Sequence, residues 1–256
     1  MITKRYHFEI IDSTNKKAKE LAMAGAQHGT LVTADGQNAG MGRRGRSWTS
    51  EENAGIYMTM ILRPKIKTDK ASMLTLVAAL AVEKGICAAC EAIGESVSSK
   101  TRIKWPNDIV LNKKKICGIL TELGLNGTEI DYVVIGIGIN VNNKEFPEEI
   151  VQTASSLFLE TGREIDRELL ITEVWKQFFV YYEQFIETMD LTLLKEEYEE
   201  VLVNKEEKVN VLDPLGAYTG FAKGITNTGE LIVDTEEEIR FVSSGEVSVR
   251  GIYGYV

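Results

Sequence analysis

The chain has 256 residues, of which 44% are hydrophobic and 26% are charged, and its formal net charge at pH 7 is -9. This composition excludes an intrinsically disordered protein and is typical of a globular one with a hydrophobic core. Because the sequence shows no signal-peptide pattern and no run of eighteen apolar residues, we expect a cytoplasmic protein with no membrane partner.

The cysteines and histidines are few. Cys87, Cys90 and Cys117 are too few and too unevenly placed for a disulfide framework. Cys87 and Cys90 form a CxxC pattern, but they lie in an alanine-rich apolar run that predicts a buried helix. With only His7 and His28 besides, packing is favoured over zinc or redox chemistry, and we predict no metal held directly by protein side chains.

The first half of the chain alternates short β-rich segments with helical stretches, a pattern that favours an α/β fold. Strands are expected at residues 7–12, 31–37 and 55–64, with a helix capped by Ser13 after the first and about thirty helical residues after Lys70. Three further β segments, 102–112, 114–124 and 131–142, are separated by turns at Asn112-Lys113 and near Asn126-Gly127. We expect them to be adjacent strands of one sheet.

In the second half of the chain the residue pattern becomes helical and then changes to short strands. Residues 163–187 and a second stretch ending near Val203 are helical in pattern. From Glu207 onward, short alternating strands separated by turns predict a small β-barrel or sandwich, and the acidic run at 235–239 predicts a solvated turn. We therefore expect two domains, residues 1–204 and residues 205–256.

A cationic loop, GMGRRGRSW at residues 40–48, follows the second expected strand. Its glycines, at 40, 42 and 45, are expected to allow positive φ angles and a close approach to a ligand. Its arginines, at 43, 44 and 46, offer donors that match carboxylates and phosphates. The alternative to such a ligand-binding loop is a surface turn whose charges have no binding role. Nucleic-acid binding is disfavoured, because the basic residues form no extended stripe and the sequence pI is about 5.0.

Three other motifs carry polar groups at strand ends. In KWPND, residues 104–108, Pro106 marks a strand edge or an irregularity, and a lysine, an asparagine and an aspartate lie close together. Lys115 stands at an expected hairpin tip, where lysines are usually just solvated. GIGINVN, residues 136–142, ends a hydrophobic strand in glycines and asparagines that could admit a flat ring. For KWPND the alternative is a buried Trp105 beside an ordinary polar turn.

Taken in order, these motifs resemble the biotin protein ligases. The resemblance rests on DSTN at 12–15, the glycine- and arginine-rich stretch at 37–48, KWPND, KxxGIL at 115–120 and GIGINVN. It implies an α+β fold: a catalytic domain like that of class II aminoacyl-tRNA synthetases, with a mixed, largely antiparallel sheet flanked by helices, and a small SH3-like C-terminal domain. Many members have arginine where this chain has Met41. The early DSTN leaves no room for an N-terminal helix-turn-helix, so we expect the enzyme without the repressor.

The resemblance implies a two-step reaction. Biotin attacks the α-phosphate of ATP to give biotinyl-5′-AMP, and a lysine of a biotin carboxyl carrier protein then displaces AMP. In the first step the biotin carboxylate and the α-phosphate, both anionic, must come together, so we expect Arg43 and Lys115 to lie on either side of them. We expect Arg46 and Mg²⁺ to contact the triphosphate. Asp108 is expected to orient the acceptor amine or take its proton.

The site residues implied by the resemblance fall into three groups. The catalytic residues are Arg43, Lys115 and Asp108. The biotin-binding residues are Ser13, Thr14, Asn15, Gln37, Gly40, Met41, Gly42, Arg43, Trp48, Lys115 and Gly118. The ATP-binding residues are Arg43, Arg46, Trp48, Lys104, Asn107, Asn140 and Asn142.

The expected partner is a biotin carrier domain of acetyl-CoA carboxylase or a related carboxylase, and a homodimer through an exposed sheet edge is a further expectation. Lipoate- or octanoate-protein ligases share the fold and the adenylate chemistry and remain an alternative. A non-catalytic biotin sensor or corepressor is another, although it would need a DNA-binding element. A nucleic-acid-binding module built on the arginine loop is the least favoured, and we expect no nucleic-acid partner.

Overall fold

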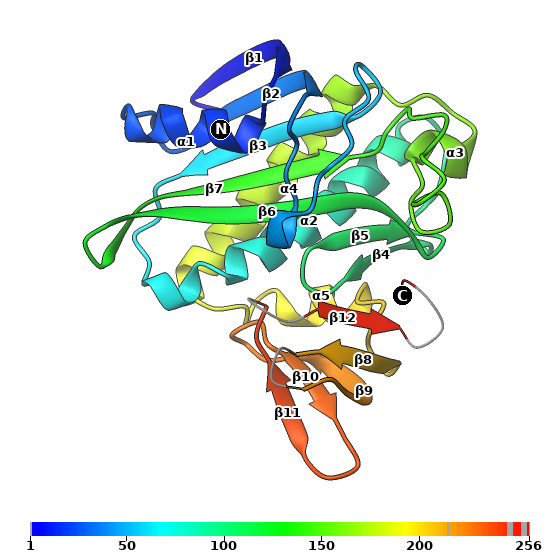
Figure 1. Ribbon diagram of the computed structural model, residues 1–256. Helices are drawn as coiled ribbons and strands as arrows, with labels where there is room; N and C mark the ends of the chain where they lie inside the picture. The colour runs from blue at the N-terminus through cyan, green and yellow to red at the C-terminus, as the bar shows by residue number, and fades with distance from the viewer. Residues whose placement is uncertain (1, 214–215, 245–247, 252–254, 256) are drawn as a thin grey trace.

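A computed structural model describes residues 2–213, 216–244, 248–251 and 255. They form two sheets (Figure 1). The larger sheet has the strand order β1-β2-β3-β7-β6-β5-β4, and the smaller has the order β11-β10-β9-β8-β12. The strands of the larger sheet are β1 Lys4–Ile11, β2 Thr30–Gln37, β3 Ile56–Leu62, β4 Thr101–Lys104, β5 Asp108–Leu111, β6 Lys114–Asn126 and β7 Glu129–Ile139. Those of the smaller are β8 Lys208–Leu212, β9 Tyr218–Ile225, β10 Leu231–Asp234, β11 Ile239–Val242 and β12 Ser248–Gly251.

The larger sheet is mixed and largely antiparallel. Only β1 and β2 pair in parallel, joined by the crossover helix α1, and the other neighbours are antiparallel. The mixed, largely antiparallel sheet implied by the resemblance is thus confirmed. Most connections between its neighbouring strands here are hairpins, which force antiparallel pairing.

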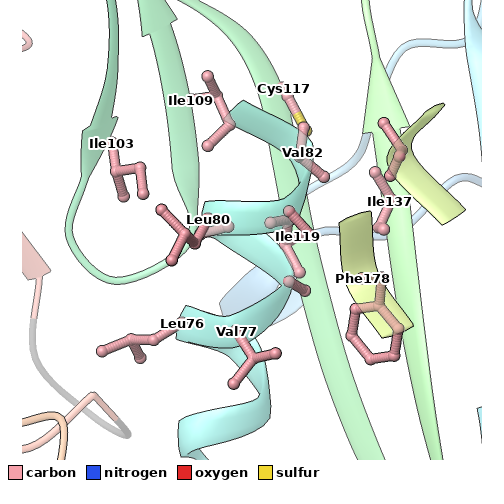
Figure 2. Close-up of a cluster of buried hydrophobic side chains, with 14 of the residues drawn as sticks. Leu76, Val77, Leu80, Val82, Ile103, Ile109, Cys117, Ile119, Ile137 and Phe178 are labelled. Atoms are coloured by element: carbon pink, nitrogen blue, oxygen red, sulfur yellow. The ribbon is translucent and has the colours of Figure 1, made fainter. Parts of the chain in front are cut away.

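The helices divide between the two faces of this sheet. They are α1 Thr14–Met23, α2 Met73–Glu91, α3 Leu157–Thr161, α4 Arg167–Thr188 and α5 Lys195–Glu200, with short 3₁₀ turns η1 Arg43–Gly45 and η2 Thr68–Lys70. Helices α2 and α4 pack together behind the sheet, while α1 and the arginine loop lie on the opposite face (Figure 1). The main core lies between α2, α4 and the sheet, where Leu80 of α2 points towards the side of Ile103 and Ile109 (Figure 2).

Helix α2 is shorter than expected. It spans 19 residues instead of about thirty, because the chain turns after Glu91 and Gly94 takes a φ of +81°. The segment Thr68–Glu91 is long and apolar enough to cross a membrane, but 83% of its apolar window is buried inside the fold. It is the core helix between the sheet and α4, as Figure 2 shows.

The segment expected as one strand at 102–112 is two strands. Strands β4 and β5 form a tight hairpin around Trp105, Pro106 and Asn107, because proline cannot continue the ladder. The next hairpin turns at Asn112 and Lys113, both with positive φ, as predicted.

The two sheets meet at the β4–β5 hairpin. The indole Nε1 of buried Trp105 donates to the carbonyl of Gly229 at 3.0 Å, and its main-chain N–H donates to Asn204 Oδ1 at 2.9 Å. Strand β8 begins at Lys208 after α5 ends at Glu200, so the predicted division at residue 204 lies between these elements. The motif KWPND therefore stands at the junction of the two sheets.

Candidate active site

A cavity of about 600 Å³ opens where the arginine loop, the sheet and the C-terminal sheet meet. Among the described residues that line it, six side chains are basic and one, Asp108, is a carboxylate. In a chain with a net negative charge, six cations at one cavity suit a site for anionic substrates. The predicted residues on its wall are Ser13, Thr14, Asn15, Gln37, Met41, Gly42, Arg43, Arg46, Trp48, Lys104, Asn107, Asp108, Lys115 and Gly118.

The floor of the cavity is a patch of glycines on two paired strands. In β6 and β7 alternate side chains face the core behind the sheet, and the residues between them face the cavity. Gly118 and Gly138 are cross-strand partners at these positions, beside Gly136. A Cβ at 138 would lie 2.7 Å from Cε2 of Trp48, and one at 118 would lie 2.8 Å from its Cζ3. The absence of side chains lets the indole of Trp48 lie on the strands.

The arginine loop is a small hairpin, which we call the lid (residues 40–48). The N–H of Gly42 donates to the carbonyl of Arg46 at 2.7 Å, and that of Trp48 donates to Gly40 at 2.9 Å. Arg44 and Gly45 turn its tip with φ of +59° and +71°. Of the three glycines, which are expected to allow positive φ, only Gly45 takes one. Position 40 has no room for a side chain, because a Cβ there would lie 2.7 Å from the carbonyl oxygen of Trp48.

Arg43 ties the lid across the cavity. Its Nη1 donates to Oδ1 of Asn107 at 2.8 Å, and its Nη2 donates to the carbonyl of Ser244 in the C-terminal sheet domain. Asn107 is itself fixed, since its Nδ2 donates to the carbonyl of Ile119 at 3.0 Å. Burial lowers the pKa of Arg43 and nearby Asp108 opposes that effect, so the guanidinium stays charged. One arginine thus links the lid, the KWPND hairpin and the second sheet.

Lys115 and Asp108 form an ion pair on the cavity wall. Nζ of Lys115 lies 2.6 Å from Oδ1 of Asp108, and the two side chains are 26% and 14% exposed. They stand on adjoining strands, as predicted from the hairpin. The main chain of Lys115 is held on its other side, where its N–H donates to Thr153 at 2.8 Å and its carbonyl accepts from Ser155. The pair is therefore rigidly placed and partly desolvated.

Lys104 is the most buried cation of the site. It is 6% exposed, and burial lowers the pKa of Lys104 to about 8, with the Asp108 carboxylate opposing a larger fall. Its ammonium is therefore close to losing its proton at slightly alkaline pH. An anion that enters the cavity would raise the pKa of Lys104 again, because a nearby negative charge favours the charged form of a lysine.

The opposite end of the cavity is neutral and hydrogen-bonded. Gln37 Oε1 accepts from the N–H of Thr14 at 2.8 Å and from its hydroxyl at 3.1 Å, while Asn15 Nδ2 donates to Glu122 at 2.9 Å. Ser13 occupies the N-cap position of α1, as predicted, but its side chain makes no capping hydrogen bond. Its hydroxyl lines the cavity instead, where donors and acceptors suit a cyclic urea.

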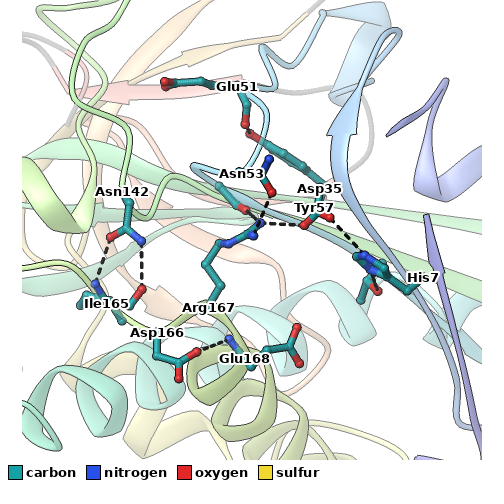
Figure 3. Close-up of polar contacts among 12 residues, drawn as sticks. His7, Asp35, Glu51, Asn53, Tyr57, Asn142, Ile165, Asp166, Arg167 and Glu168 are labelled. Carbon is teal, nitrogen blue, oxygen red and sulfur yellow. Dashed lines mark hydrogen bonds and ion pairs between the residues drawn. The ribbon is translucent and has the colours of Figure 1, made fainter. Parts of the chain in front are cut away.

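The segment that follows the lid, residues 51–55, is anchored by a polar network (Figure 3). Arg167, at the start of α4, lies 3.0 Å from Oδ1 of Asp35 and donates to the carbonyl of Gly55 at 3.2 Å and to Oδ1 of Asn53 at 3.3 Å. His7 Nε2 contacts the other oxygen of Asp35 at 3.1 Å. The end of the lid is thereby fixed to β1, β2 and α4, while its tip is held through Arg43.

Three predicted ligands lie away from the cavity wall. Gly40 lies behind Trp48. The Nδ2 of Asn140 donates to the carbonyl of Ser155 at 3.0 Å, and Asn142 exchanges two hydrogen bonds with the main chain of Ile165 (Figure 3). Both asparagines brace the segment that leads from β7 to α4. The assignment of Asn140 and Asn142 to the nucleotide stays a prediction that this geometry does not support.

Sequence reasoning missed several residues of the wall. Gly136 and Gly138 were left out of the predicted site residues, although they belong to GIGINVN, the stretch expected to admit a flat ring, and glycines at alternate positions of a buried strand leave one face of it bare. Val249, Arg250 and Tyr255 come from the C-terminal part of the chain. They carry no local signal, because only the folded contact between the two sheets brings them to the cavity.

The cysteines stay outside the site. Burial raises the pKa of the Cys87 and Cys90 thiols to about 12 and about 11, so both are protonated and pack in α2. Within the described part of the chain, no cluster of three or more histidine, cysteine, aspartate or glutamate residues could hold a metal ion.

Known proteins share both parts of this architecture. The biotin/lipoate A/B protein ligase family matches residues 7–140, and the biotin protein ligase C-terminal domain matches residues 206–250. The bifunctional ligase/repressor BirA of Bacillus spizizenii is 40% identical over 243 residues, which cover 94% of this chain and 72% of the relative. The biotin–[acetyl-CoA-carboxylase] ligase of Paracoccus denitrificans is 30% identical over 244 residues, covering 94% and 98%.

A solved structure extends the likeness to the whole described fold. The biotin protein ligase from Aquifex aeolicus in complex with biotin and ATP has 32% sequence identity and a TM-score of 0.84, and the match covers 97% of this chain and 99% of that one. The likeness thus includes the C-terminal sheet beside the cavity. The chain therefore belongs to the biotin/lipoate A/B protein ligase family, and within that family to the biotin protein ligases.

Proposed function

We propose that this ligase activates biotin with ATP to biotinyl-5′-AMP and transfers the biotinyl group to a lysine of a biotin carboxyl carrier domain. The observation that carries the proposal is the Lys115–Asp108 ion pair, with Nζ and Oδ1 2.6 Å apart on the wall of a cavity otherwise rich in cations. A cation beside a carboxylate serves both half-reactions, because one step needs fixed positive charge and the other needs a proton acceptor.

In the first step the biotin carboxylate attacks the α-phosphorus of ATP, and the bond to pyrophosphate breaks. Two anions at 4 Å repel by about 4 kcal/mol at an effective dielectric constant of about 20, so fixed cations are needed between them. Arg43 and Lys115, which both line the cavity, supply these charges. Lys104 and Arg46 also line it and would cover the triphosphate.

The biotin ring system fits the neutral end of the cavity. The hydroxyls of Ser13 and Thr14 and the amide of Gln37 can match the ureido group, while the bare strands at Gly118 and Gly138 leave room for the bicyclic ring and chain. Trp48 supplies an apolar wall beside them. The lid then closes over a carboxylate that is becoming an acyl phosphate and must be shielded from water.

In the second step the neutral acceptor amine attacks the carbonyl carbon of the adenylate. The bond from that carbon to the phosphate oxygen breaks, AMP leaves with the electron pair, and the amine loses a proton. Asp108 is the carboxylate of the described cavity wall, so we assign it to orienting the amine and accepting its proton. Lys115 then faces the phosphate that leaves.

Magnesium accompanies ATP in this proposal without a protein site. Asp108 is already paired with Lys115, and one paired carboxylate does not make a metal centre. Magnesium ions are commonly held by substrate phosphates and water together with few protein ligands. We therefore derive no step from a protein-bound metal.

We also propose the fold class of each domain, a surface for homodimer formation and carrier docking, and a cellular compartment. The mixed antiparallel sheet with helices behind it supports a class II aminoacyl-tRNA synthetase-like catalytic domain, and the small five-stranded sheet supports an SH3-like one. Strand β1 is an edge of the larger sheet and carries Ile10, 51% exposed, so this edge is our candidate for homodimer formation and for docking a carboxylase carrier domain. The cytoplasm remains the expected compartment.

The two half-reactions should separate in Asp108→Asn. This variant should keep biotin-dependent exchange of pyrophosphate into ATP, while single-turnover transfer from preformed adenylate falls by about 10²-fold or more. Asp69→Asn, an exposed position in η2, is the matched control. Equal loss of both half-reactions would contradict the role of Asp108. Exchange supported by lipoate or octanoate would favour the alternative ligases, and the absence of any exchange would favour a sensor.

A further inference from the structure

Tyr255, which follows β12 in the chain, reaches the reacting end of the cavity. Its hydroxyl donates to Oδ2 of Asp108, and Nζ of Lys104 lies 3.6 Å from the centroid of its ring. With Val249 and Arg250, it lines the cavity beside the KWPND hairpin. The mechanism proposed above uses Asp108 and Lys104 but has no task for the tyrosine.

Both carboxylate oxygens of Asp108 are engaged in this arrangement. Nζ of Lys115 lies 2.6 Å from Oδ1, and the phenol of Tyr255 occupies Oδ2. The carboxylate is 14% exposed, so little of it faces solvent. An incoming acceptor amine that must donate a hydrogen bond to Asp108 therefore finds its place already taken.

The chemistry of this place identifies what the tyrosine displaces. A carboxylate repels a phosphate group and attracts an N–H or O–H donor, so the position beside Oδ2 suits an amine and not the triphosphate. Burial and the neighbouring Asp108 raise the pKa of Tyr255, which keeps the phenol protonated and able to donate. The ring covers one side of the Lys104 ammonium, which has three N–H donors to share.

We propose that Tyr255 occupies the position of the acceptor lysine at Asp108 and competes with it, so that the tyrosine must leave before biotin is transferred. This inference rests on the proposed function, since it takes Asp108 as the partner of the acceptor amine. A competitor within the chain lowers the apparent affinity for the carrier domain by the fraction of molecules in which it is undocked.

Steady-state biotinylation of a carrier domain tests the competition. Tyr255→Phe removes the hydrogen bond and keeps the ring over Lys104, and Tyr255→Ala removes both. We expect the KM for the carrier to fall about fivefold in Tyr255→Phe, and further in Tyr255→Ala, because a smaller fraction of the enzyme is self-occupied. Tyr218→Phe is the matched control, since Tyr218 lies in β9 against Arg240 and away from the cavity.

Two results would overturn the competition while leaving biotin ligation intact: a carrier KM that stays unchanged or rises in Tyr255→Phe, or a fall found in the KM for ATP instead. Failure of the wild-type chain to biotinylate any carrier would instead overturn the proposed function.

A spectroscopic measurement tests the docked contact without activity. The full chain labelled with 3-fluorotyrosine contains nine such residues, and the signal of residue 255 is the one that Tyr255→Phe removes. We expect this ¹⁹F signal to shift in Asp108→Asn and to move further towards the frequency of exposed fluorotyrosine when carrier and adenylate are added. A signal at residue 255 that is indifferent to both changes contradicts the proposal.

Discussion

Gly118 and Gly138 show how a missing side chain builds a site. Both lie in extended strands without positive φ, so the backbone does not require glycine at either position. What requires glycine is the indole of Trp48, which lies against both of them. The cavity therefore owes its floor to the alternation of the strands, with isoleucines facing the core and glycines facing the cavity.

Gly138→Ala should weaken biotin binding and leave the fold intact. The added Cβ would lie 2.7 Å from Trp48 Cε2, which forces the indole off the floor and narrows the pocket. The displaced indole narrows the space for biotin, and a loss of about 1.4 kcal/mol or more of its binding free energy should raise the KM for biotin about tenfold or more. Gly36→Ala is the control, because its Cβ meets nothing closer than 3.6 Å. An unchanged KM for biotin in Gly138→Ala would show that the ligand does not use this floor.

The lowered pKa of Lys104 predicts that kcat/KM for ATP falls at alkaline pH. Its pKa in the folded chain is lowered to about 8 by burial, so the cation is present below that pH and is lost above it. Because kcat/KM reports the free enzyme, kcat/KM for ATP in pyrophosphate exchange should fall as the pH rises through about 8. Lys104→Arg keeps its charge and should remove this limb of the profile. A profile that is flat in the wild type, or equally steep in Lys104→Arg, contradicts the assignment.

Sequence motifs predict the residues that lie close together along the chain. The lid arginines, KWPND and Lys115 reach one cavity because the loop after β2, the β4–β5 hairpin and the start of β6 belong to the same sheet. Asn140 and Asn142 follow an equally suggestive strand, but their amides bond to the main chain at Ser155 and Ile165. Sequence alone does not say towards which neighbour an asparagine side chain turns.

The lid is the element that converts these residues into a closed site. Its hairpin is held at the tip by the Arg43–Asn107 bond and after its end by Arg167 (Figure 3). Strand patterns predicted where this loop begins and that Pro106 marks a strand edge or an irregularity, but not that residues 102–112 form two separate strands. That division matters, because the turn it creates carries Asn107 to the lid and Trp105 to the second sheet.

Arg43→Gly should open the lid. Loss of the bonds to Asn107 and to the carbonyl of Ser244 frees the tip, so biotinyl-adenylate should dissociate about 10²-fold faster from the variant. Arg44→Gly is the comparison, because Arg44 is exposed at the turn and its φ of +59° suits glycine. The rate at which biotinyl-adenylate dissociates from each variant tests this prediction. Release from Arg43→Gly at the wild-type rate would contradict the role proposed for Arg43.

At the scale of the whole molecule, the site is a product of two sheets. The larger sheet supplies the floor, the lid and the Lys115–Asp108 pair, and the C-terminal part adds Val249, Arg250 and Tyr255 to the wall. The contact through Trp105 and Gly229 joins segments more than a hundred residues apart. Such a contact leaves no mark in either local sequence, which is why the existence of both sheets was predictable and their shared cavity was not.

The central claim is that this cavity makes biotinyl-adenylate and passes the biotinyl group to a carrier lysine. The most direct measurement is the mass of a purified biotin carrier domain after incubation with the protein, ATP, Mg²⁺ and biotin, with a carrier lacking its acceptor lysine as control. The account predicts a gain of one biotinyl group that requires ATP and the acceptor lysine. An unchanged mass, or a gain only when lipoate or octanoate replaces biotin, would contradict it.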